Sequence, residues 1–300
     1  MSNVREVSRL ITAHKQEEGA GFIVRRPLPS TSLALADPFL LIDEMGPVEY
    51  APGEAVGAPD HPHRGFETIT YVLSGEFEHE DSAGHRGVLR SGDVQWMTAG
   101  AGIVHSEMPS RRVRDAGGRV HGFQIWVNLP AKLKMTQPRY QEVASAKIPS
   151  ASSSDGLASV RVIAGEALGA RSVIDTLTPV VYQDWSLSPG ADVTVPLAAE
   201  QQALLYVFEG AARVGNDGLV VDDGRLAVLS PGASVRLRAA EGASAPSRML
   251  LLAGVPLNEP VARYGPFVMN TPQEIQQAFR DYQSGKMGDI TRTAQVQATV

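Results

Sequence analysis

Residues 68–97 read TITYVLSGEFEHEDSAGHRGVLRSGDVQWM, and this stretch decides the fold class. Short runs rich in β-branched and aromatic residues, such as Thr68–Leu73 and Val94–Met97, alternate with turn residues. The turn at 81–84 (DSAG) and the turn at 91–93 (SGD) separate these runs at close intervals. Many short strands joined by tight turns are typical of a β-sandwich or a β-barrel. The same alternation of short apolar runs and turn residues extends from about residue 20 to about residue 255, which predicts an all-β protein.

The length of the chain and a weak internal repeat indicate two domains. The chain has 300 residues with 43% hydrophobic content, enough for two ordinary cores. Residues 71–75 (YVLSG) resemble residues 206–210 (YVFEG), and the turns that follow echo one another at an offset near 135 residues. The Ala- and Ser-rich stretch 144–156 is the expected linker between domains at 1–143 and 157–300.

One helix is predicted near the end of the chain. Thr271 can cap it, Pro272 occupies the first helical position, and Glu274 completes a capping box. An apolar stripe at helical spacing then predicts packing onto a barrel, and Gly285 is the expected stop. The stripe consists of Ile275, Ala278, Phe279 and Tyr282.

The charge, the cysteine content and the lengths of the apolar stretches argue against several classes of protein. A net charge of -6 argues against direct, sequence-independent binding to nucleic acid, and we interpret Arg111, Arg112 and Arg114 as a solvated loop. The absence of cysteine excludes disulfides, thiolate catalysis and Cys-based zinc sites. The N-terminus lacks the apolar run of a signal peptide, and no stretch reaches the roughly 18 apolar residues of a membrane span. The expectation is a soluble cytoplasmic protein without a membrane partner.

The histidines predict a metal site in the first half of the chain. All seven lie at or before His121. His61 and His63 are two residues apart, so in an extended segment both imidazoles point to one face. His105 and Glu107 repeat this geometry with one imidazole and one carboxylate. Two such pairs on neighbouring strands would supply four ligands inside a barrel.

The predicted ligand set suits a divalent transition metal. Nitrogen and oxygen ligands are compatible with Fe, Mn, Co, Ni, Cu or Zn. Four ligands in an octahedral arrangement would leave two positions for a chelating substrate or O2.

The chain resembles the pirin family. The motifs that carry the resemblance reach both halves of the sequence: residues 61–71 (HPHRGFETITY), 75–79 (GEFEH), 92–100 (GDVQWMTAG), 102–109 (GIVHSEMP), 126–130 (WVNLP) and 265–271 (GPFVMNT). The resemblance implies two tandem cupin (jelly-roll-like) barrels, with an iron-type metal in the N-terminal barrel and none in the C-terminal one. It places the ligands at His61, His63, His105 and Glu107. The general cupin pattern would instead favour Glu67, which shares the parity of His61 and His63 if the strand is unbroken.

The resemblance also implies a function. Pirins are associated with quercetin 2,3-dioxygenase activity, which is the oxidative cleavage of a flavonol by O2 with an iron-type metal. In that reaction Glu107 is a candidate general base. The alternative is an iron- or redox-sensing regulator that binds a transcription factor or metabolic enzyme. A third hypothesis is a stable barrel with an incidental metal and no reaction.

Other polar and aromatic residues of the first half are assigned mostly structural roles. We expect His79 and His85 to be surface or structural residues, and His121 to be a hydrogen-bonded core histidine. Arg64 is expected to pair with Glu67 or another acid. Four apolar residues are candidates either to line a pocket or to pack in the core: Phe66, Met97, Phe123 and Trp126.

Overall fold

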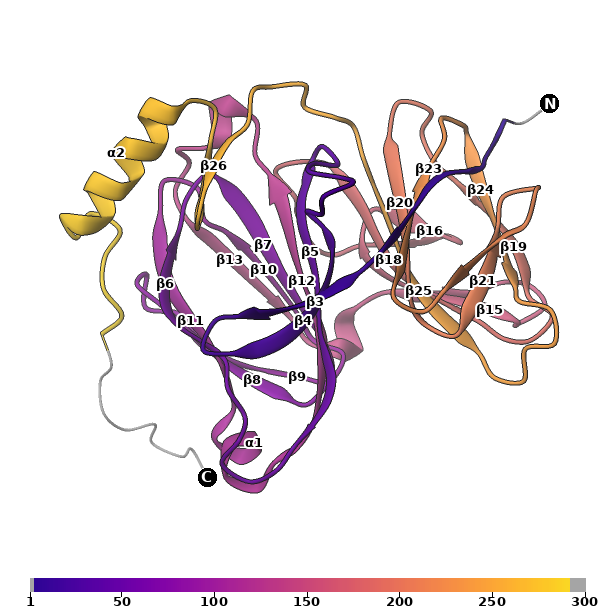
Figure 1. Ribbon diagram of the computed structural model, residues 1–300, viewed down its shortest axis with the longest axis horizontal. Coiled ribbons are helices and arrows are strands. Elements are labelled where there is room, and N and C mark those ends of the chain that lie inside the picture. Colours follow the sequence, from indigo (N-terminus) through magenta and orange to yellow (C-terminus); the bar gives the residue numbers. More distant parts are fainter. Residues whose placement is uncertain (1–2, 292–300) are drawn as a thin grey trace.

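The computed structural model describes residues 3–291 and consists of two β-barrels side by side with a helix on one flank (Figure 1). The all-β, two-barrel prediction is therefore confirmed. Each barrel is built from one seven-stranded sheet and one smaller sheet.

The N-terminal barrel holds the predicted histidine cluster on its smaller sheet. That sheet has the order β6 (Ala58–His63), β11 (Ile103–Pro109), β8 (Glu76–Asp81) and β9 (Arg86–Arg90). The larger sheet has the order β13 (Arg139–Val143), β10 (Val94–Thr98), β7 (Phe66–Ser74), β12 (Gly118–Asn128), β5 (Phe39–Tyr50), β4 (Phe22–Leu28) and β3 (His14–Glu18).

The C-terminal barrel repeats this plan with an apolar interior, in which Trp185, Leu205 and Leu251 are buried. Its larger sheet has the order β14 (Ser150–Ser152), β15 (Ala158–Ala164), β18 (Val180–Leu187), β25 (Ser247–Gly254), β20 (Gln202–Glu209), β23 (Arg225–Leu229) and β2 (Val7–Thr12). Its smaller sheet has the order β1 (Val4–Arg5), β24 (Ser234–Ala239), β21 (Ala211–Val214) and β22 (Leu219–Asp222), and β19 (Asp192–Pro196) also pairs with β24.

The remaining elements are short connections and the C-terminal pieces. They are α1 (Arg111–Ala116), η1 (Ala131–Leu133), η2 (Ser145–Lys147), the hairpin of β16 (Glu166–Ala167) and β17 (Ala170–Arg171), the pair β26 (Ala262–Tyr264) and β27 (Phe267–Met269), and α2 (Pro272–Gln283).

Strand alternation gives the large N-terminal sheet two different faces. Ile69, Trp96 and Phe123 point to one side, where they join a buried cluster with Tyr206 and Leu250 of the C-terminal barrel. The two barrels therefore share one hydrophobic core between their large sheets. The alternate residues on the same strands point to the other face of the sheet, toward the interior of the N-terminal barrel.

The first strands of the chain pair with the C-terminal barrel, and a segment after β25 contacts the N-terminal barrel. β1 and β2 pair with β24 and β23 of the C-terminal barrel, and Figure 1 shows the N-terminal strand on that side. After β25 the chain returns to the N-terminal barrel, where Phe267 forms a bridge with Arg64. The expected linker at 144–156 contains η2 and β14, and β14 pairs with β15.

The predicted C-terminal helix is confirmed as α2. Thr271 and Glu274 form the complete capping box, and Ile275 and Ala278 are buried against Val104 of the N-terminal barrel. The helix therefore packs onto the barrel that carries the histidines.

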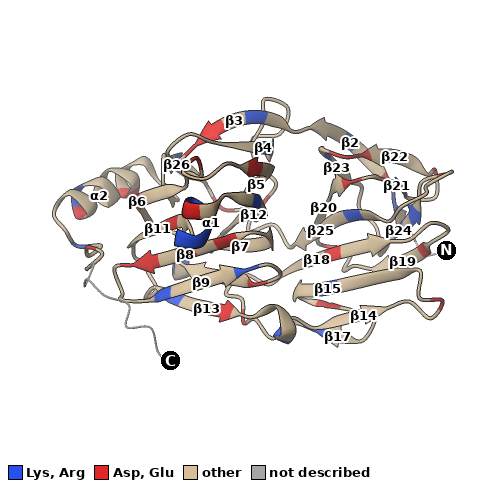
Figure 2. Cartoon of the chain, turned by 90° about the horizontal axis from the view of Figure 1, so that it is seen from below, with Lys and Arg blue, Asp and Glu red and all other residues tan. Residues whose placement is uncertain are grey.

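The three arginines between residues 111 and 114 belong to a short helix, α1, instead of a loop. Each has an acidic partner: Arg111 lies near Asp115, Arg112 near Glu76 and Arg114 near Glu78. Figure 2 shows blue and red segments together on α1, which lies beside β8. Each of these arginines thus lies 3.3–3.8 Å from a carboxylate oxygen. Among the described residues, no helix is long and apolar enough to cross a membrane.

Candidate metal centre

His61, His63 and His105 converge inside the N-terminal barrel. β6 and β11 are antiparallel, and His105 is the Cα partner of His61. One ring nitrogen from each histidine lies within 4.8 Å of the others, and the Nε2 atoms of His61 and His63 are 3.1 Å apart. The structure thus brings together three of the four predicted ligands at the spacing that one metal ion requires.

The environment favours the neutral form of His63 and His105. Burial lowers the pKa of His63 and of His105 well below the usual histidine range, and the neighbouring His61 lowers both further. Neutral imidazole is the form that binds metal. His105 is fully buried, and neither ring nitrogen has a hydrogen-bond partner among the described residues. A buried donor and acceptor without partners is costly, and a metal ligand role accounts for it.

Two of the three histidines are held by carbonyl oxygens on their outer side. Nδ1 of His61 lies 2.7 Å from the carbonyl oxygen of Pro59, and Nδ1 of His63 lies 3.2 Å from that of Pro266. Nδ1–H donates in each contact, which leaves Nε2 with its lone pair for a metal. Pro266 belongs to the segment that returns from the C-terminal barrel, so the site is built from two segments that are 203 residues apart in the sequence.

Glu107 lies beside the histidines but not within 4.8 Å of all three. Its carboxylate forms a group with His105 and His79, and Oε1 accepts a 2.6 Å hydrogen bond from the Thr70 hydroxyl. Glu107 also lines the cavity described below, together with His61. The predicted carboxylate is thus at the wall of the same site.

Glu67 lies on the opposite face of the large sheet, away from the histidines. Its Oε1 accepts a 2.7 Å hydrogen bond from Thr98, and burial raises its pKa. The parity argument from His63 fails because Gly65 breaks the strand at φ +91°, where a Cβ would lie 1.9 Å from the carbonyl oxygen of Val268. The pairing expected of Arg64 with Glu67 is absent too, since Arg64 binds Asp281 at 2.9 Å. Arg64 was expected to pair with Glu67 or with another acid, and its partner is the second of these, Asp281.

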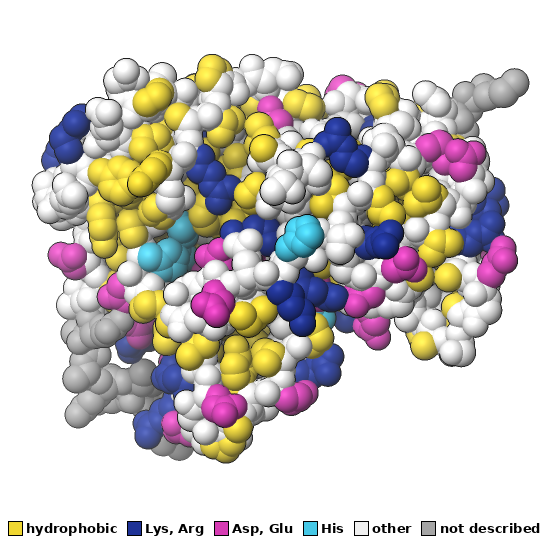
Figure 3. All heavy atoms as spheres, in the orientation of Figure 1, with side chains coloured by type: hydrophobic (Ala, Val, Ile, Leu, Met, Phe, Trp, Pro, Cys, Tyr) yellow, Lys and Arg dark blue, Asp and Glu magenta, His cyan; other side chains and the backbone are white. Residues whose placement is uncertain are grey.

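A cavity of about 550 Å³ opens onto the cluster, a volume within the range of small-molecule sites. Apolar side chains of Leu41, Met45 and Trp126 form part of its wall. The Arg263 guanidinium lies 4.8 Å from the centre of the Trp126 ring, in a cation–π contact. Figure 3 shows histidine atoms among hydrophobic and basic side chains on this face of the N-terminal barrel. The cavity therefore combines a metal-type cluster, an aromatic surface and a cation.

The aromatic and apolar candidates divide between cavity and core. Trp126 lines the cavity, whereas Phe66, Met97 and Phe123 are fully buried and do not line it. His121 is a core histidine, as expected, with Nε2 2.8 Å from Oε1 of Glu44.

His79 was expected to be a surface or structural residue. The surface alternative is wrong, because the side chain is 1% exposed inside the barrel, next to His105. His85 is half exposed and binds Asp81. The signal for His79 was its parity with Phe77 and Asp81 on β8, which places all three toward the barrel interior.

Comparison with known proteins agrees with this architecture. Residues 21–127 match the family model described as Pirin, and residues 182–288 match that of the Pirin C-terminal cupin domain. A pirin-like protein of Solanum lycopersicum is 46% identical over 96% of this chain and 94% of its own length. Pirin of Homo sapiens is 42% identical over 96% of both chains.

A solved structure supports the same assignment. The crystal structure of a quercetin 2,3-dioxygenase from Acinetobacter baumannii superposes with a TM-score of 0.89 at 38% identity, covering 96% of this chain and all of that one. A bacterial pirin from Escherichia coli in complex with nickel(II) shares the fold at 21% identity and a TM-score of 0.62. The two matched domains and the full-length relatives lead to one conclusion: this chain is a member of the pirin family.

Proposed function

We propose that this protein is a metal-dependent oxidoreductase that cleaves a flavonol-like substrate with O2, as in the quercetin 2,3-dioxygenase reaction. The observation that carries the proposal is the buried histidine cluster at the wall of a cavity large enough for a small planar molecule. The similarity to a solved quercetin 2,3-dioxygenase supports the choice of reaction.

The proposed metal ligands are His61, His63, His105 and Glu107. Iron(II) is the expected ion, and the same nitrogen and oxygen set also suits Mn, Ni, Cu, Co or Zn. When bound, the ion would supply Lewis-acid stabilisation of a deprotonated enol and a route for electrons to O2. The outer contacts of His61 and His63 to carbonyl oxygens hold two of the rings in place for this role.

Glu107 is the proposed general base. Its carboxylate lines the cavity, so a substrate hydroxyl can reach it. The Thr70 hydroxyl holds Oε1 at 2.6 Å, so Oε2 is the oxygen that would bind the metal and, once released from it, accept the substrate proton.

The cavity wall is suited to a planar aromatic enol. Trp126 offers an aromatic edge or face, and Leu41 and Met45 exclude water from the ring. Arg263 places a positive charge in the same cavity, which favours the deprotonated form of a bound hydroxyl.

The test is to purify the protein without a metal-chelating tag and to measure metal content together with O2 uptake on quercetin. We expect about one iron per chain and O2 uptake, both lost in His105→Ala, and we expect O2 uptake to be lost in His61→Ala as well. His14→Ala, at an exposed position on β3, is the matched control and should retain both. One metal per chain with no O2 uptake on a panel of flavonols would contradict the proposed reaction.

A further inference from the structure

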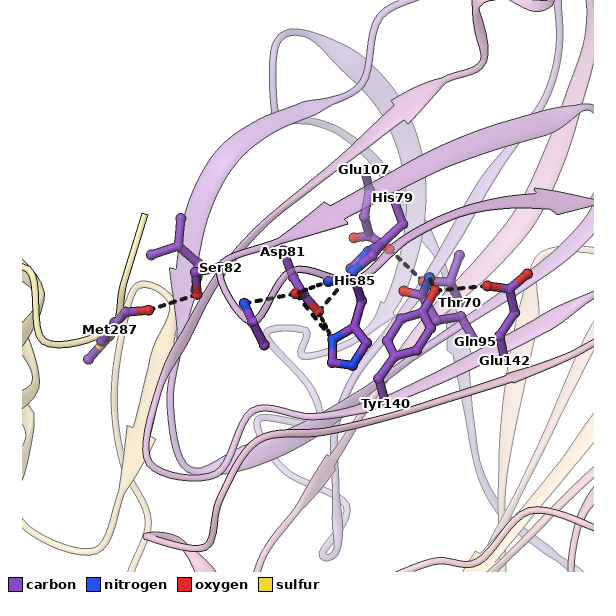
Figure 4. Close-up of polar contacts among 12 residues, drawn as sticks. Thr70, His79, Asp81, Ser82, His85, Gln95, Glu107, Tyr140, Glu142 and Met287 are labelled. Atoms are coloured by element: carbon purple, nitrogen blue, oxygen red, sulfur yellow. Dashed lines mark hydrogen bonds and ion pairs between the residues drawn. The ribbon is translucent and has the colours of Figure 1, made fainter. Parts of the chain in front are cut away.

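A second group of metal-type ligands lies behind the first. One ligand atom from each of His79, His105 and Glu107 lies within 4.8 Å of the other two. Figure 4 shows His79 and Glu107 close together, next to Thr70 and Tyr140. His61 and His63 are not members of this group, and His79 does not line the cavity.

The pairing of β8 with β11 brings these residues together. Glu107 is the Cα partner of His79, and His105 is the partner of Asp81. Residues directly opposite in an antiparallel pair point to the same face, so all four side chains face the barrel interior. The juxtaposition is therefore fixed by strand register and not by a mobile loop.

His79 has no hydrogen-bond partner that explains its burial. The side chain is 1% exposed, and neither ring nitrogen makes a hydrogen bond among the described residues. The adjacent ring of Tyr140, centred 5.1 Å away, packs against it, but the Tyr140 hydroxyl donates to Glu142 instead. Together with the two unpartnered nitrogens of His105, the barrel holds two buried imidazoles with no assigned partner.

The carboxylate of Asp81 lies next to Nε2 of His79. Its Oδ2 lies 3.6 Å from Nε2 of His79, just beyond hydrogen-bond distance. Oδ1 is fixed by the backbone N–H groups of Ala83 and His85, at 2.9 and 3.0 Å. A carboxylate that accepts from the outer nitrogen of a ligating histidine is a common feature of metal sites.

We propose that His79, His105 and Glu107 form a second, inner position for a divalent transition-metal ion. Bonds of about 2.0–2.2 Å place ligand atoms up to roughly 4.4 Å apart around one ion, so the group needs only a small contraction. His105 is common to both groups. A neutral imidazole has one nitrogen lone pair, so His105 can bind an ion at the outer or at the inner position, and binding at both at once would require loss of its remaining N–H proton.

The test uses cobalt(II) as the only added metal. In the His61→Ala/His63→Ala double variant the outer position is removed, and we expect this variant to bind about one cobalt(II) per chain with visible d–d absorption. Adding His79→Asn should abolish that binding, and His79→Gln repeats the test with a different side chain. Adding His14→Asn to the double variant instead is the matched control and should leave the binding intact.

Circular dichroism would first establish that each variant is folded. If the folded double variant binds no cobalt(II), or if His79→Asn and His79→Gln leave its binding unchanged, the inner position does not exist. The measurement reads metal binding and not O2 uptake, so its failure would leave the proposed dioxygenase reaction untouched.

Discussion

The carbonyl oxygen of Pro266 lies 3.2 Å from Nδ1 of His63, a residue 203 positions earlier in the chain. Through this contact a segment that follows the C-terminal barrel orients a ligand in the N-terminal one. The C-terminal segment is therefore part of the proposed metal centre.

Removal of this segment should weaken metal binding. A chain that ends at Val261 loses the carbonyl of Pro266, and we expect metal affinity to fall by roughly 10- to 100-fold, the usual effect of removing an outer contact of a ligating histidine. Isothermal titration with cobalt(II) would measure it. Pro266→Ala keeps the carbonyl and is the control. A folded truncated chain that binds as tightly as the full chain would contradict this role.

Matched substitutions can distinguish the roles of the two candidate carboxylates, Glu107 and Glu67. Glu107→Gln should lower the rate of O2 uptake on quercetin by roughly 10²- to 10⁴-fold, the range for loss of a general base. Glu67→Gln should leave metal content unchanged, because that side chain binds Thr98 on the other face of the sheet. Metal content and O2 uptake are measured on both variants. Loss of metal in Glu67→Gln with normal binding in Glu107→Gln would reverse the assignment.

Arg263 should act on substrate binding more than on turnover. Arg263→Met removes the cation over Trp126, and we expect KM for the flavonol to rise about tenfold while kcat changes little, as for an interaction present in both ground and transition states. Steady-state O2 uptake gives both constants. Arg86→Met, on the rim of β9, is the control. A fall in kcat with unchanged KM would show that Arg263 acts in the reaction step.

Lys134 should make stability depend on pH in the alkaline range. Its Nζ donates to the carbonyl oxygens of Gly65 and Val268 and to Asn128, and burial lowers its pKa to about 8. The unfolded value is about 10.4, so between these two values the unfolded chain holds the proton that the folded chain has lost. The free energy of unfolding therefore rises with pH across this window, since the cost of burying a charged ammonium disappears.

The comparison with Lys134→Met isolates this effect. From pH 7.5 to 10.5 the wild-type protein should gain roughly 2–3 kcal/mol of unfolding free energy relative to that variant. Urea denaturation at a series of pH values measures the difference, and Lys132→Met controls for the loss of one lysine. If the unfolding free energies of the wild type and Lys134→Met change with pH in parallel, burial of the charged Lys134 ammonium does not destabilise the fold.

The sequence allowed prediction of features that depend on local spacing. His61 with His63, and His105 with Glu107, are two residues apart, and strand periodicity alone places each pair on one face. The capping box of α2 is equally local, and the turn pattern was sufficient to predict the all-β fold.

Features that depend on long-range contacts were not predictable in this way. The pairing of β1 and β2 with strands more than 200 residues later has no local signal. The same is true of Pro266 and Arg263, which enter the site because the chain returns to the first barrel. The condition attached to Glu67, an unbroken strand from His63, fails at Gly65. The burial of His79 depends on an inward face of β8 that was not assigned from the sequence.

The return of the chain to the first barrel also sets an order of events during synthesis. The ribosome synthesises β6 and β11 well before Pro266 and α2. Until then the cavity lacks one wall, and His63 lacks the acceptor that holds its ring. The proposed metal site can therefore be completed only after the segment that contains Pro266 has been made, so a nascent chain that stops before it would not yet present the finished centre to metal ions.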